Sequence, residues 1–268
     1  MSLLWLRVAA LLYGIAAFAV LPAALYDRPR WRLVAIPATG MAWLFHFVSL
    51  IEMLIAAHHA LPVETHEMLS LLALLLAGAF LLTYLRYRTL AFGVFVLPIV
   101  TLLCLAPAIR RGQELLPFIN HRGWIFFHIA LLMAAYAAML VSLLASVLYL
   151  VQERRLKSKA SGRLRLPPLE TTDQIALKAL MFGFPCMTGG LLIGSLLAQM
   201  TVGASYFRDP KVLLAFGMWL AYIAMIYIRQ HSGLRGRRAA YLSGFVFLVM
   251  LTVWCANQFS YVHRFTAP

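Results

Sequence analysis

The sequence contains few charged residues and very few acidic ones. Only 12% of its 268 residues are charged and 63% are hydrophobic, whereas soluble domains carry about 25% charged and about 45–50% apolar residues. Each membrane-spanning helix needs about 20 apolar residues, and the longest polar stretch, 152–173, has only the length of a loop. The composition therefore excludes a sizeable soluble domain and predicts an all-α integral membrane protein surrounded by lipid.

Cysteine is also scarce, and its distribution excludes several cofactor classes. Cys104, Cys186 and Cys255 are far apart, and each lies in an apolar run. The sequence has no Cys-x-x-Cys pair, so we expect neither a disulfide scaffold nor covalently attached haem. Any haem must be held by side-chain ligands alone.

Sequence motifs of known enzyme classes are missing as well. There is no Walker-type loop, His-Glu-x-x-His motif, nucleophile elbow or pair of neighbouring carboxylates. The sequence therefore leaves open whether the protein is an enzyme, and it favours a binding or accessory role over catalytic turnover. Its nine acidic residues also disfavour a pathway for hard cations, which need oxygen ligands.

Eight long apolar runs are present, and they predict eight transmembrane helices in one membrane domain, residues 1–268. The predicted spans are 3–25, 33–55, 68–85, 89–109, 123–151, 174–200, 211–229 and 239–261. Gly190 and Gly194 have the small-xxx-small spacing that lets two helices approach closely in lipid.

The basic residues, which give a net charge of +14, lie mainly between these runs. Most follow the first, third, fifth and seventh runs, and the loop 152–173 is the richest in them. Because positively charged loops stay in the cytoplasm, we expect that loop inside and both chain termini on the outer, periplasmic side of a bacterial inner membrane. Charge in these positions indicates orientation rather than nucleic-acid binding.

With this orientation, every histidine except His231 lies outside the membrane or in its outer half. His46 and His128 lie within predicted spans, where ionisable residues are costly and usually functional, although a hydrogen-bonded structural role fits them equally well. The histidines of the loop after the second span are interpreted as solvated: His58, His59 and His66. Glu52 is six residues from His46, so we expect it on a different helix face.

The predicted fifth helix carries part of a haem site. His121, Trp124 and His128 are spaced three and four residues apart, so they share one face. Histidine is a common haem ligand, and an apolar slot and nearby cations complete such a site. Arginines at the predicted outer surface are available to the haem propionates: Arg110, Arg111 and Arg122. His121 is also compatible with simple anchoring at the membrane surface.

Three sequence segments resemble parts of one known family. In the run that begins at Trp124, His128 is followed eight residues later by Tyr136. Asp209-Pro210-Lys211 precedes a helix with Trp219, as at the end of that family's tryptophan-rich signature. The segment from Asn257 to His263 resembles the position of its second outer histidine. Together these segments resemble the cytochrome c assembly proteins of the CcsA/ResC type.

Other segments resemble the small YpjD/HemX-like branch most closely. They are His231 to Arg238, Pro167-Pro168-Leu169-Glu170, and His46 with Glu52. The tryptophan-rich signature, which cradles haem in the synthases, is reduced here to 206–210 and contains no tryptophan. Tyr227 stands where the synthases carry a second membrane histidine.

The resemblance implies a protein that binds or handles haem in cytochrome c biogenesis or haem homeostasis. It implies His128 and His263 as an outer pair of axial ligands, and His46 as a ligand within the membrane. Together with the histidine positions, it predicts non-covalent haem b on His128 and His263, or on His121 in place of either. Trp124 and Phe127 are expected to pack on the ring.

Two alternative functions follow from other features of the sequence. A cofactor-free accessory protein would dock a haem-synthesis or cytochrome-maturation partner through its basic loop 152–173. An importer of copper or another soft metal would use His46 and some of the twelve methionines, although these are scattered and suit flexible packing.

Overall fold

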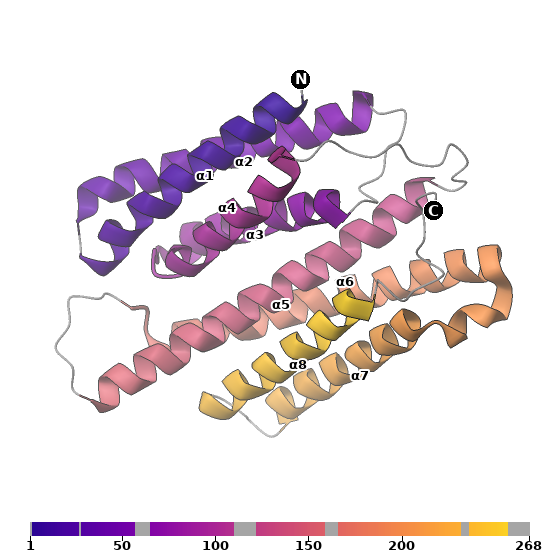
Figure 1. Ribbon diagram of the computed structural model, residues 1–268. Coiled ribbons are helices and arrows are strands. Elements are labelled where there is room, and N and C mark those ends of the chain that lie inside the picture. Colours follow the sequence, from indigo (N-terminus) through magenta and orange to yellow (C-terminus); the bar gives the residue numbers. More distant parts are fainter. Residues whose placement is uncertain are drawn as a thin grey trace.

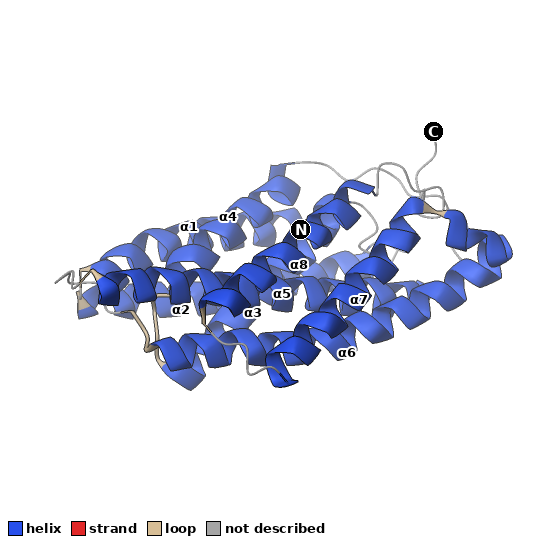
Figure 2. Ribbon diagram, turned by 90° about the horizontal axis from the view of Figure 1, so that it is seen from below, coloured by secondary structure: helices blue, strands red, loops and turns tan. Residues whose placement is uncertain are grey.

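The computed structural model describes residues 2–26, 28–56, 65–109, 122–158, 166–231 and 236–256. These residues form eight α-helices and one short 3₁₀-helix, and the described part of the chain contains no strand (Figure 2). The helices are α1 (Ser2–Leu25), α2 (Pro29–Ala56), α3 (Thr65–Tyr87), α4 (Gly93–Ile109), α5 (Arg122–Lys157), α6 (Leu169–Val202), α7 (Pro210–His231) and α8 (Arg237–Ala256). The 3₁₀-helix η1 (Gly203–Arg208) joins α6 to α7.

Seven of the described helices are long and apolar enough to cross a membrane, so the chain is a multi-pass membrane protein. The exception is α4, whose 17 residues extend about 26 Å at 1.5 Å per residue, slightly less than the roughly 30 Å hydrocarbon core. It begins four residues later than the predicted span 89–109 because Leu90–Phe92 form a turn, in which the Gly93 N–H donates to the Leu90 carbonyl. Eight membrane spans thus remain a prediction.

The two longest helices are α5 and α6, with 36 and 34 residues. They take up much of the stretch 152–173 that the sequence predicts as a loop, since α5 continues to Lys157 and α6 begins at Leu169. Good helix formers fill the end of α5 from Gln152 to Lys157, and Glu153 and Lys157 form an ion pair one turn apart. The basic residues of the last turn of α5 also suit the negative end of the helix dipole.

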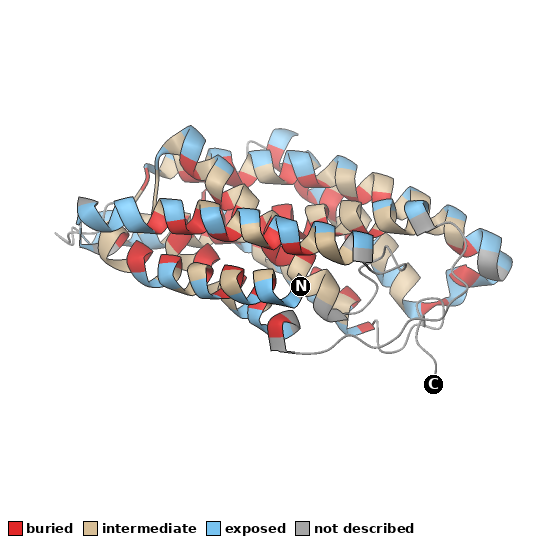
Figure 3. Ribbon diagram, turned by 90° about the horizontal axis from the view of Figure 1, so that it is seen from above, coloured by how far each residue is buried: buried red, intermediate tan, exposed pale blue. Residues whose placement is uncertain are grey.

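The helices pack into two halves (Figure 1). In the first half α1 packs against α2 and α4, while α3 packs against α2 and α4. In the second half α5 packs most extensively against α6, and α8 lies against α5 and α7. The contact between α3 and α5 is the main connection between the halves. Buried residues face the helix–helix interfaces and exposed ones face outward (Figure 3), as expected for helices surrounded by lipid.

Basic and tyrosine side chains gather where α2, α6 and α8 begin and α3, α5 and α7 end, which we call the basic end. Arg32 Nε donates to the Tyr84 hydroxyl at 2.6 Å, and Lys178 Nζ donates to the Tyr87 hydroxyl at 3.1 Å. The first contact joins α2 to α3 and the second joins α3 to α6. The structure therefore places the basic residues of separate loops at one end of the bundle, on the left of Figure 1.

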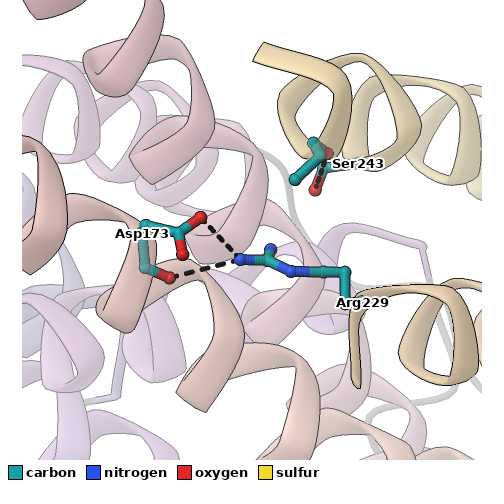
Figure 4. A network of polar contacts seen from close by, with 4 residues as sticks. Asp173, Arg229 and Ser243 are labelled. Atoms are coloured by element: carbon teal, nitrogen blue, oxygen red, sulfur yellow. Dashed lines mark hydrogen bonds and ion pairs between the residues drawn. The ribbon is translucent and has the colours of Figure 1, made fainter. Parts of the chain in front are cut away.

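A buried ion pair lies near the same end. Arg229 of α7 donates to Asp173 Oδ1 of α6 at 2.7 Å and to the Asp173 carbonyl at 3.4 Å (Figure 4). The Arg229 side chain is only 2% exposed. This pair fixes the end of α7 against the beginning of α6.

Candidate functional site

Close approach of α5 to α6 creates the surroundings of His128. A methyl group added at Gly190 would lie 2.7 Å from Leu132 Cδ2, and one added at Gly194 would contact the His128 ring directly. Gly190 and Gly194 thus let α5 pack against the backbone of α6, as their spacing predicts. The imidazole of His128 occupies the space above Gly194.

One hydrogen bond defines the chemical state of the His128 ring. Its Nδ1 lies 2.7 Å from the Gly190 carbonyl oxygen, which can only accept, so Nδ1 carries the hydrogen and donates it. In the neutral ring Nε2 then holds a lone pair. Metal-binding histidines are commonly oriented by the same contact, a donated bond from the other ring nitrogen to a carbonyl. Nε2 is therefore the ring nitrogen that can accept a hydrogen bond or ligate a metal.

A cation lies near this imidazole, contributed by the beginning of α7. Trp219 Nε1 donates to Thr188 Oγ1 at 3.0 Å and fixes the register of α7 on α6. Lys211 is eight residues before Trp219, about 12 Å along the helix, which brings it level with the part of α6 close to Gly194. The Lys211 ammonium accordingly interacts electrostatically with His128. The sequence marks Lys211 only as the end of the Asp209-Pro210-Lys211 segment and does not predict its approach to His128.

Asp209 positions this lysine. Its carboxylate accepts a hydrogen bond from the Lys211 backbone N–H at 2.9 Å, and the residue is completely buried. Asp209 caps the first turn of α7, and Pro210 follows at a helix position that does not need its missing N–H. The Asp209-Pro210-Lys211 segment thus has a definite structural role.

The aromatic residues expected on a haem ring do not surround His128. Trp124 and Phe127 are 59% and 57% exposed, on the outer surface of α5, whereas the His128 ring lies against α6. Helix spacing placed Trp124 and His128 on one face, but only the His128 side chain turns into the groove of α6. The remaining predicted site residues have side chains outside the described residues: Arg110, Arg111, His121, Arg122 and His263.

His46 lies in the other half of the protein, in a closed environment. It is 1% exposed, its Nε2 is 2.8 Å from Ser70 Oγ, and its ring meets the edge of Tyr13. Glu52 Oε1 accepts a hydrogen bond from Trp5 Nε1 at 3.1 Å. His46 thus contacts both α1 and α3, whereas the hydrogen bond of Glu52 joins it to α1.

The histidine at the basic end is exposed. His231 Nδ1 lies 3.3 Å from the Tyr227 carbonyl, and its ring stacks on Tyr227 with the ring centroids 4.2 Å apart. Tyr227 is 59% exposed on α7, in the second half of the bundle, whereas His46 lies on α2 in the first half.

A cavity of about 350 Å³ lies at the basic end, between α5, α6 and the beginning of α8. Tyr149, Glu170, Asp173 and Gly236 line it. Gly236 has a positive φ of 71°, and a methyl group there would lie 2.7 Å from the Tyr149 hydroxyl. The two segments that resemble the YpjD/HemX-like branch around Glu170 and Gly236 therefore meet at this cavity.

Comparison with known proteins places the chain in a family. A family model described as cytochrome C assembly protein matches residues 35–257. The chain belongs to the cytochrome c assembly protein family. The match begins within α2 and includes His46, His128 and Lys211, whereas α1 lies before it. Assignment to the YpjD/HemX-like branch remains a prediction.

Several relatives named cytochrome c biogenesis protein CcsA are similar to this chain. The protein of Heterosigma akashiwo is 25% identical over 235 residues, 72% of each chain. That of Guillardia theta is 27% identical over 201 residues, 66% of each chain. That of Prochlorococcus marinus strain AS9601 is 30% identical over 192 residues, which cover 64% of this chain and 59% of the relative. No solved structure matches the chain.

Proposed function

We propose that this chain binds haem through His128 and acts in cytochrome c biogenesis. The observation that carries the proposal is the bond from Nδ1 of His128 to the Gly190 carbonyl, which leaves Nε2 as the ligating atom. Membership of the cytochrome c assembly family and the names of the relatives support it. Haem is the iron porphyrin that c-type cytochromes carry.

Residues near His128 also provide a fixed imidazole orientation and a positive charge, both of which favour haem binding. Gly190 and Gly194 hold the imidazole in one orientation, and Lys211 places a positive charge near it. Haem carries two propionate carboxylates, so this cation favours its binding. We propose Arg110, Arg111 and Arg122 as further propionate partners, and His263 or His121 as the second axial ligand.

The surroundings of His46 do not fit haem. The ring is enclosed by α1, α2 and α3, and its Nε2 contacts the Ser70 hydroxyl, so a macrocycle would have to separate packed helices. Nor do three or more His, Cys, Asp or Glu side chains gather as metal ligands anywhere in the described ranges. We therefore place haem at His128 and do not propose soft-metal import.

We further propose that the basic end faces the cytoplasm of a bacterial inner membrane, with both termini on the outer side. The clustering of Arg32, Lys178 and Arg229 near one end of the bundle supports this orientation. His128 then lies in the outer half, where haem is available to cytochrome-maturation partners.

Replacing His128 with Ala tests the proposed function. We expect the purified wild-type protein, expressed with added haem precursor, to show a Soret band and sharp α and β bands after reduction with dithionite. The variant His128→Ala should lose most of this absorbance, and added imidazole should restore part of it by replacing the missing ligand.

His231→Ala is the matched control, because His231 is an exposed histidine at the basic end. It should retain the wild-type spectrum. Unchanged haem content in folded His128→Ala protein would refute the assignment of His128 as the ligand.

A further inference from the structure

Two buried polar groups meet between α1 and α2 in the first half of the bundle. Tyr13 and His46 are 0% and 1% exposed, and their rings pack edge to face with centroids 5.9 Å apart. Ser70 of α3 contacts His46 Nε2. The Tyr13 hydroxyl and His46 Nδ1 have no hydrogen-bond partner among the described residues. Two orphaned polar atoms therefore belong to a single aromatic contact.

This arrangement is energetically unfavourable if no water molecule bonds to the two buried polar atoms. A buried hydroxyl or imidazole nitrogen without a hydrogen bond loses its hydration and gains nothing in return, and lipid offers no alternative partner. Buried polar groups in proteins are almost always bonded to protein or to ordered water. Water satisfies both atoms together, since it donates and accepts hydrogen bonds and needs two to four polar neighbours.

The same interface continues toward the end of the bundle opposite the basic end. Glu52 lies six residues beyond His46, about 9 Å along α2, and contacts α1 through Trp5. Its second carboxylate oxygen, Oε2, is buried and also lacks a partner among the described residues. Ser49, buried as well, lies midway between Glu52 and His46. Polar groups thus extend from near the end of α2 to its middle.

We propose that α1, α2 and α3 enclose a water-binding site at Tyr13 and His46, hydrated past Glu52 from the end opposite the basic end. Water there bonds to the Tyr13 hydroxyl and to His46 Nδ1, while Ser70 holds Nε2. The site gives His46 proton exchange with the aqueous phase on that side. It is independent of haem binding at His128, which lies in the other half of the protein.

Tyr13 itself lies outside the segment that the family comparison matches, because that segment begins at residue 35. The two orphaned atoms are therefore brought together by the packing of α1 against α2.

Hydroxyl-radical labelling of the full-length protein in detergent detects such a site, since radicals form from water next to the labelled side chain. Tyr222 is the control, because it is equally buried but its hydroxyl donates to the Leu180 carbonyl at 3.2 Å. We expect Tyr13 and His46 to be labelled several-fold faster than Tyr222. Labelling of Tyr13 no faster than that of Tyr222 would overturn the proposal.

The variant Tyr13→Phe provides a second test, because the direction in which the thermal unfolding midpoint changes distinguishes a hydrated Tyr13 hydroxyl from a dry one. If the Tyr13 hydroxyl bonds to water, its removal lowers the thermal unfolding midpoint and slows labelling of His46. If the hydroxyl is dry, its removal leaves the midpoint unchanged or raises it, which would overturn the proposal. Tyr222→Phe loses a bond to protein in either case and calibrates the size of the decrease.

Discussion

At the scale of single residues, Gly194 has no room for a side chain because the His128 imidazole occupies the space where a β-carbon would lie. His128 in turn depends on Gly190, whose carbonyl accepts its Nδ1 hydrogen. The orientation of one candidate ligand is therefore determined by two glycines of another helix.

We predict that Gly194→Ala destabilises the protein by about 1–3 kcal/mol, the usual cost of overpacking a tight interface, and lowers haem content with it. Alanine is the better helix former by about 1 kcal/mol, so a decrease in stability must come from the contact with His128. The thermal unfolding midpoint and the Soret absorbance of the purified variant measure both effects.

Gly217→Ala in α7 is the matched control, because a methyl group there meets nothing within 4 Å. This variant should be as stable as wild type or slightly more stable. Equal thermal unfolding midpoints of Gly194→Ala and Gly217→Ala would show that the α5–α6 contact at His128 has room for a methyl group.

At the scale of helices, polar contacts attach the part of α7 from Trp219 to Arg229 to α6. Trp219 donates to Thr188, Tyr222 donates to the Leu180 carbonyl, and Arg229 pairs with Asp173. These contacts fix the register that brings Lys211 toward His128. The ion pair at the basic end thus helps to position a cation at the opposite end.

Removing the carboxylate of that pair should therefore be costly. We predict that Asp173→Ala lowers the free energy of unfolding by about 3–5 kcal/mol, because it leaves the buried Arg229 without its carboxylate. Unfolding in mixed detergent micelles measures the change. The matched control is Glu153→Ala, which breaks the Glu153–Lys157 pair, where the lysine is 69% exposed, and should cost at most about 1 kcal/mol. Similar losses in the two variants would argue against a buried pair.

At the scale of the whole molecule, the basic residues of separate loops lie at one end, which makes the orientation in the membrane testable. We predict that a cysteine at Ser158, on the basic end, is protected from an impermeant maleimide in intact spheroplasts. A cysteine at Ser205 in η1, at the opposite end, should be labelled. Both variants use a background in which Cys104, Cys186 and Cys255 are replaced. Labelling at Ser158 alone would reverse the proposed topology.

Local patterns of the sequence predicted the all-helical membrane architecture and the close approach at Gly190 and Gly194. Apolar run length and residue spacing are properties of a single helix, so they can be read before any packing is known. The same patterns could not show that Trp124 faces outward, that Lys211 approaches His128 or that Tyr13 meets His46. Each of these depends on how two helices are rotated and shifted against each other.

The sequence contains only weak indications that Tyr13 and Lys211 have specific partners. A tyrosine within the apolar first span and a lysine at the beginning of the seventh are both polar groups at membrane-spanning positions, which usually have a specific partner. The sequence identifies such residues as unusual, and only the packing of neighbouring helices identifies their partners.

The division of the bundle into two halves has a consequence for biosynthesis. Because α1 to α4 pack mainly against one another, they can assemble as soon as α4 leaves the ribosome. At roughly 5–20 residues per second, the ribosome needs roughly 7–30 s more to complete α8. During that interval the nascent first half already shields His46 and Glu52 from lipid, and α3 presents a preformed surface on which α5 docks when it is inserted.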